Sequence, residues 1–131
     1  MAALIENAIS IMNPSGTTVA LDAAAATTLY TVPAGKVFIP IMVVMRISGD
    51  PVDCTCTIGS TGTTATSFLN TQTFHTNVDA TGEVAIFQPI PAASTVASMS
   101  YAAADVFQIT IGSGGAAGGV TGKTFVLGFL Y

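Results

Sequence analysis

The chain has 131 residues, of which half are hydrophobic and only 8% are charged, and its net charge is −4. This length fits one domain that can bury its own core without disulfides or metals. With three basic residues, the chain offers a nucleic-acid backbone almost nothing to bind, so we expect no nucleic-acid partner. The longest strongly apolar run, 37–45, contains a proline, whereas a membrane-spanning helix needs about twenty residues, so we expect no membrane partner.

The scarcity of charge also bears on assembly. Ordinary soluble domains carry about 25% charged residues, roughly three times the share here. A surface so poor in charge repels neighbours weakly and suits a subunit whose faces are covered by copies of itself or by a large partner. No Lys or Arg precedes Lys36, so the positive start of a secretory signal peptide is missing and we expect the chain to be made in the cytoplasm without export.

The N-terminal segment 1–16 fits more than one structure. Leu4, Ile5 and Ile9 lie on a helical stripe, while Ile5, Ile9 and Ile11 also follow the period of a strand. The segment is either the first strand of the domain or an arm that leaves it at 13–16 and packs on a neighbouring subunit; a frayed terminus is the remaining alternative. In the arm interpretation, Leu4, Ile5, Ile9 and Ile11 are interface residues.

In the remaining segment, 17–131, turn-forming residues recur at short intervals between pieces rich in Val, Ile, Thr, Phe and Tyr. Short strands separated in this way predict an all-β fold, a single-domain antiparallel β-sandwich of the jelly-roll-like type with about eight strands. The predicted strands are Thr17–Leu21, Thr27–Val32, Lys36–Ser48, Val52–Ile58, Ser67–His75, Glu83–Gln88, Thr95–Tyr101, Val106–Ile111 and Thr124–Tyr131.

The two cysteines, Cys54 and Cys56, lie in one predicted strand. Positions i and i+2 of a strand face the same side about 7 Å apart, which does not suit a disulfide, so we expect free thiols. Together with His75 they form a set of three metal ligands, but structural zinc sites normally close with four. We therefore expect no metal site and no cofactor.

The acidic residues and the single histidine give no catalytic pattern. Nothing in the spacing of His75, Asp79 and the serines indicates a triad. Asp50 and Asp53 flank a proline, where they either form and solubilise a turn or make a weak cation site. We expect no catalytic residues.

Near the end of the chain, "AGGVTGKT" at 117–124 satisfies the loose form of a phosphate-binding loop. Such a loop needs a helix after it, because the helix N-terminus binds the phosphates. Here "FVLGFLY" follows, which is aromatic, β-branched and interrupted by Gly128, and the preceding 105–111 alternates like a half-buried strand. We therefore predict a β-hairpin across this loop, no nucleotide site and no enzyme activity.

The loop itself, 112–122, contains six glycines among eleven residues. It is either a connector or a close-contact surface against a neighbour, where a Cβ atom would collide. In the second interpretation Gly114, Gly115, Gly118 and Gly119 are interface residues.

The stretch "TTLYTVPAGKVFIPIMVVMRISG" at 27–49 resembles a segment frequent in small β-structured virion proteins of tailed bacteriophages. In that segment Tyr-x-Val-Pro-Ala-Gly-Lys makes a tight turn between two strands: Pro33 presets φ, Gly35 takes positive φ and Lys36 opens a long strand. The size of the chain, its Ala, Thr and Gly content and its apolar last strand also resemble those of phage capsid decoration (cement) proteins.

This resemblance implies a structural protein of the virion. It implies a homo-oligomer, trimeric as is frequent in that family, which binds the major capsid protein of the same virus on the capsid exterior and stabilises the shell. Phage tail and fibre modules share the same turn, so the alternative is a module that binds a host receptor or glycan. In that alternative Tyr101 is the best aromatic platform, although a core or interface role also fits it.

Overall fold

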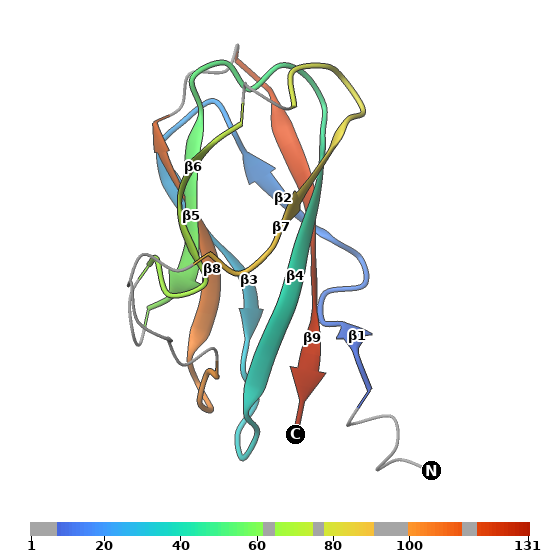
Figure 1. Cartoon of the computed structure of the whole chain (residues 1–131), viewed down its shortest axis with the longest axis vertical. Helices are drawn as coiled ribbons and strands as arrows, with labels where there is room; N and C mark the ends of the chain where they lie inside the picture. Colours follow the sequence, from blue (N-terminus) through green and yellow to red (C-terminus); the bar gives the residue numbers. More distant parts are fainter. Residues whose placement is uncertain (1–7, 62–64, 75–77, 91–99, 114–117) are drawn as a thin grey trace.

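Two antiparallel β-sheets pack against each other in the computed structural model (Figure 1). The structure describes residues 8–61, 65–74, 78–90, 100–113 and 118–131. Sheet A has the strand order β1-β9-β4-β7, with β2 also paired to β9, and sheet B has the order β3-β8-β5-β6. The strands are β1 (Ser10–Ile11), β2 (Thr17–Ala20), β3 (Ala25–Thr31), β4 (Phe38–Ile47), β5 (Thr55–Ser60), β6 (Leu69–Thr73), β7 (Val84–Phe87), β8 (Val106–Ser113) and β9 (Thr121–Leu130).

The strand order is that of a jelly roll. β1 and β2 both pair antiparallel with β9, so together they behave as one interrupted edge strand. Counted that way, each sheet has four strands, and the chain changes sheet at every connection except that between β5 and β6. Double-sheet jelly rolls have eight strands in two Greek keys. The predicted fold class is therefore confirmed.

The described residues form no helix with the length and hydropathy that a bilayer crossing requires.

Side chains at alternate strand positions fill the space between the sheets. On β4, Phe38, Val43 and Met45 are fully buried, whereas Val44 between them points to the outside of sheet A. The pairing of β4 with β9 shifts register between Pro40 and Met42, a bulge that accommodates a proline within a central strand.

An aromatic cluster occupies one part of this core. The ring centroid of Phe107, on β8, lies 5.5 Å from that of Phe38 and 5.4 Å from those of Phe68 and Tyr101. All four residues are at most 1% exposed. The hydroxyl groups of Tyr101 and Ser67 are hydrogen-bonded at 2.8 Å, so the one polar tip of the cluster is satisfied.

The segment 27–49 forms β3, a tight turn and β4, and its turn joins the two sheets. The amide of Lys36 donates to the carbonyl of Pro33 at 3.2 Å, and Gly35 has a φ of 73°. The predicted positive φ at Gly35 is therefore confirmed. β4 begins at Phe38 rather than at Lys36.

Most predicted strands differ from the structure by one or two residues at an end, and two of them begin three residues from their predicted starts. β5 begins at Thr55 rather than Val52, because the chain first makes a turn in which Cys54 N donates to Pro51 O at 2.9 Å and Asp53 has a φ of 54°. β9 begins at Thr121, three residues before the predicted start. The predicted strand 95–101 lies largely outside the described residues, and its last residue, Tyr101, forms an isolated bridge with Phe38.

The predicted hairpin between the last two strands is wrong. β8 pairs with β3 and β5 in sheet B, whereas β9 pairs with β1, β2 and β4 in sheet A. The glycine-rich connection therefore passes from one sheet to the other. Packed sheets lie about 10 Å apart, a distance that the seven residues between Ser113 and Thr121 easily cover.

Two buried glycines of β9 provide a matched test of the packing between β9 and β4. A Cβ atom at Gly128 would collide with the carbonyl oxygen of Ile39 and lie 2.6 Å from Cε2 of Phe38. At Gly122 it would meet only the flexible side chain of Met45. We expect Gly128→Ala to lower the free energy of unfolding by about 3 kcal/mol and Gly122→Ala by about 1 kcal/mol, measured by urea denaturation. Equal losses would contradict the close approach of the two backbones.

Candidate interaction surface

The outer face of sheet A carries rows of apolar side chains across its strands. Residues opposite each other in an antiparallel ladder share a face, and Val44 lies opposite both Ile86 on β7 and Phe125 on β9. In the next row, Met42 lies opposite Leu127, which also faces Ile11 on β1. We call the following set the apolar face: Ile11, Ile39, Met42, Val44, Val84, Ile86, Phe125, Leu127 and Phe129.

Several of these side chains are substantially exposed. Ile86 is 60% exposed, and Val84 and Ile11 are each 49% exposed. An antiparallel sheet with one face in solvent normally alternates apolar and polar residues, whereas a sheet covered on both faces is apolar throughout. β4 apart from Arg46, and β9 from Phe125 onward, follow the second pattern, although within the described chain only their inner faces are covered by the other sheet.

The outer face of sheet B has a different composition. Thr28 lies opposite Gln108, and Thr110 lies between Ala26 and Thr57. These residues are small or polar, as expected for a face in water. The two sheets of one molecule thus differ, so the apolar face is not a consequence of the low charge of the whole chain.

One end of the apolar face is basic. Arg46 on β4 lies directly opposite Lys123 on β9, and both are exposed. We call these two residues the basic pair. A Cβ atom at Gly82 would lie 3.4 Å from Nη2 of Arg46, and one at Gly16 would lie 2.7 Å from Cε of Lys123, so the two side chains extend to opposite sides. Among the described residues, neither cation forms an ion pair.

The basic pair borders a shallow hollow of about 300 Å³. Ser48, Thr81 and Thr121 also line it. Ser48 Oγ accepts from the amide of Thr121 at 2.9 Å, and Thr81 Oγ1 donates to the carbonyl of Ser48 at 3.2 Å, so these side chains are fixed by the backbone. None of the described residues that line the hollow is acidic.

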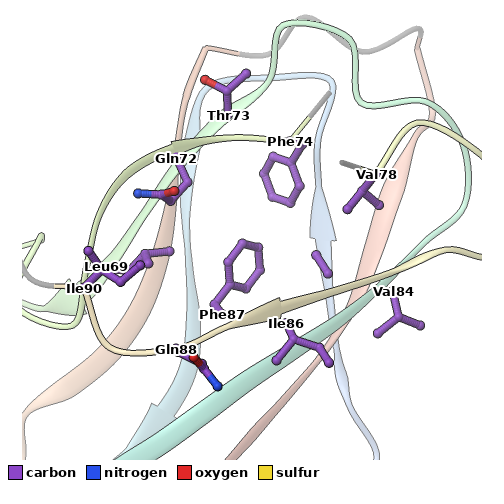
Figure 2. Close-up of a pocket in the computed structure, with 11 residues that line it drawn as sticks. Leu69, Gln72, Thr73, Phe74, Val78, Val84, Ile86, Phe87, Gln88 and Ile90 are labelled. Carbon is purple, nitrogen blue, oxygen red and sulfur yellow. The ribbon is translucent and has the colours of Figure 1, made fainter. Parts of the chain in front are cut away.

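A separate cleft of about 240 Å³ is lined by residues of β6, β7 and the segments that flank them (Figure 2). Phe74 and Phe87 point toward each other inside it, with ring centroids 5.6 Å apart and an interplanar angle of 89°. Gln72 and Gln88 supply polar groups at its border. None of the described residues that line it is ionisable, and most of their side chains are apolar.

The N-terminal residues predicted at an interface are partly placed by the structure. Ile11 belongs to β1 and to the apolar face, and Ile9 just before it is 55% exposed. Leu4 and Ile5 lie outside the described residues. The interface role of all four stays a prediction.

The glycine loop is described only in part. Gly114 and Gly115 lie outside the described residues. Gly118 and Gly119 are exposed, with open space where a Cβ atom would stand. Gly119 has a φ of 88°, and its amide donates to Oδ2 of Asp22 at 2.8 Å, which fixes the turn. Their contact with a neighbour stays a prediction.

The string that resembles a phosphate-binding loop has the wrong geometry for one. Thr121–Leu130 is a strand, so the residues after the glycines present no helix N-terminus. Lys123 is exposed on the outer face of sheet A, whereas Thr124 is fully buried on the inner face. Two side chains on opposite faces of a strand cannot hold the same phosphate.

The aromatic platform considered for glycan binding is not on the surface. Tyr101 is 1% exposed and belongs to the aromatic cluster of the core. The pKa of its hydroxyl group is raised, mainly by burial and also by the charge of Asp105, while the hydrogen bond with Ser67 acts in the opposite direction.

No group of three potential metal ligands occurs within the ranges that the structure describes, which exclude His75. Cys54 and Cys56 are free thiols, as predicted, and both are buried.

The buried thiols lead to a pH prediction. Burial raises the pKa of Cys54 from 9.0 to about 11, and burial together with the nearby Cys54 raises that of Cys56 to about 12. The native fold thus favours the neutral thiols; this contribution to stability is complete below pH 9 and is lost as pH rises toward 11 to 12. We expect both thiols to resist Ellman's reagent at pH 8 until the protein is unfolded, and thermal stability to fall above pH 9. The Cys54→Ala/Cys56→Ala variant should lose less stability over that pH range, and rapid labelling of the native protein would contradict the prediction.

Comparisons of this chain with protein-family models, with curated proteins and with solved structures found no match.

Proposed function

We propose that this chain is a structural virion protein, a capsid decoration protein that binds the outside of a phage shell and stabilises it. The observation that carries the proposal is the apolar face of sheet A, set against the polar outer face of sheet B in the same molecule. Monomeric soluble proteins seldom expose a large contiguous apolar patch, and such patches mark interaction sites. Jelly rolls are a frequent fold of viral capsid domains.

Two further features support a role in assembly rather than catalysis. The chain carries 8% charged residues, so its surface opposes association weakly. The segment 27–49, which resembles a turn of small phage virion proteins, forms the link between the sheets through β3 and β4. In this proposal the partners are the major capsid protein and further copies of this chain, arranged as a trimer.

Buried apolar area provides the binding energy in this proposal, about 25 cal/mol per Å², repeated over many copies on one shell. Binding to intact particles should therefore survive 1 M NaCl with at most a few-fold loss, because salt screens exposed charges but not apolar contacts. Release of the protein from particles by salt alone would count against an apolar interface.

Immunogold labelling of virions with antibodies against this chain tests the location. Labelling over the whole shell is the expected result. Labelling confined to the tail would favour the alternative, a tail or fibre module that binds a host receptor or glycan. Absence of the chain from virions would contradict both.

A further inference from the structure

The basic pair is unfavourable in the isolated subunit. Like charges directly opposite each other on neighbouring strands destabilise a sheet, and Arg46 and Lys123 are opposite each other on β4 and β9. They are two of only three basic residues in a chain of net charge −4, yet no described carboxylate pairs with either. A negative group from outside the subunit would relieve this repulsion.

The surroundings of the basic pair suit such a group. The two side chains diverge, Arg46 toward Gly82 and Lys123 toward Gly16, and both border the hollow of about 300 Å³. Arg46, Lys123 and the hydroxyl-bearing Thr121 all line the hollow that a carboxylate would enter. Hydrogen bonds between charged partners are shorter and stronger than those between neutral groups.

A second copy of the same face does not supply this group. The outer face of sheet A carries no carboxylate among its paired residues. If two copies packed face to face about a two-fold axis, the basic pair of one would meet either the basic pair or the apolar face of the other. The first arrangement brings four like charges together, and the second buries cations without a counter-charge, which is strongly unfavourable.

The size of the face also favours a large partner over a second single subunit. Four strands about 4.8 Å apart and eight residues rising about 3.3 Å each give a face of roughly 500 Å². Each partner of a stable complex of standard size buries about 800 Å². A contact of this size is weak between two single subunits and becomes stable when it is repeated over many copies on one large partner.

We infer that the apolar face docks on an unlike protein, whose surface is apolar and carries an Asp or Glu side chain positioned to enter the hollow beside Arg46 and Lys123. This inference rests on the proposed function, because it names the chemistry of the partner surface. The apolar rows supply the buried area of the contact. The acidic side chain determines how the partner is positioned on the face and disfavours surfaces that lack such a side chain.

A pair of amphiphiles of equal chain length tests this inference on the isolated protein. Dodecanoate and dodecyltrimethylammonium, each below its critical micelle concentration, are titrated against the labelled protein while backbone amide shifts are followed by NMR. We expect both to shift resonances of β4 and β9, with dodecanoate binding about tenfold more tightly. The variant Arg46→Gln/Lys123→Gln should lose that preference, whereas Lys36→Gln, which removes the third basic residue at the remote turn, should keep it.

Four results would overturn the inference. In the titration these are equal binding of the two amphiphiles, binding of neither, and a preference that persists in the double variant. The fourth is a dimer in sedimentation that Val44→Asp dissociates, which would assign the face to a second copy. Because the titration needs no virion, its outcome is independent of the immunogold result. Absence of the chain from virions would refute the proposed function and leave the carboxylate preference standing, and loss of that preference would refute only the inference.

Discussion

Val44→Asp should weaken binding of the subunit to phage shells at least about 100-fold while the subunit stays folded. Val44 is at the centre of the apolar face, between Ile86 and Phe125. A carboxylate at this point would be buried against an apolar partner, which costs about 3 kcal/mol or more when no hydrogen bond compensates. Co-sedimentation with purified particles measures the effect.

The matched control is Thr110→Asp. Thr110 is on β8, a central strand of sheet B, and faces outward with an intermediate exposure like that of Val44. Thr110→Asp introduces the same charge on the opposite outer face, so particle binding should be unchanged. Both variants should keep a melting temperature close to that of the unmodified chain. Normal binding by Val44→Asp, or equal loss in both variants, would exclude the apolar face as the docking surface.

Phe107→Ala should lower the free energy of unfolding by about 3 to 5 kcal/mol. The ring is fully buried and lies next to Phe38, Phe68 and Tyr101, so its removal leaves a cavity that three fixed aromatic rings border. Aromatic pairs of this edge-to-face type also contribute beyond the buried area. Equilibrium denaturation in urea, followed by circular dichroism, measures the loss.

The control for this prediction is Phe125→Ala, which removes the same side chain from the outer face of sheet A. Phe125 is only partly buried, so we expect a loss of about 1 kcal/mol in the isolated subunit and a clear loss of particle binding. The two variants thus separate folding from docking. A larger loss of stability in Phe125→Ala than in Phe107→Ala would contradict the assignment of inner and outer faces.

Many local features of this fold follow from residues close together in the sequence. The alternation of Phe107, Ile109 and Ile111 with polar residues identifies β8 and its buried side. The proline and glycine of the Pro33–Lys36 turn fix the entry into β4, because one presets φ and the other takes a positive φ. Turn residues that recur between pieces rich in β-branched and aromatic residues indicate a sandwich of about eight strands.

The sequence did not predict which strands pair with each other. A period of two identifies a strand and its buried side, but it carries no information on the partner strand. Thus β8 and β9, joined by a glycine-rich loop, fit a hairpin equally well, although each pairs in a different sheet. The loop is long enough for both outcomes, and only the packing of the whole jelly roll distinguishes them.

The candidate interaction surface could not be predicted for the same reason, because it depends on which strands pair. The sequence shows that β4, apart from Arg46, and β9 from Phe125 onward are apolar, a sign that both faces of these segments are covered. It does not show that Ile11 on β1 and Ile86 on β7, which are strands at opposite edges of sheet A, extend that surface across the sheet. Composition and local pattern thus determined that the chain is a charge-poor β-sandwich with apolar strands. Only tertiary pairing decided that Arg46 and Lys123 lie opposite each other at the end of one apolar face, because the residues near either cation do not specify which strand pairs with which.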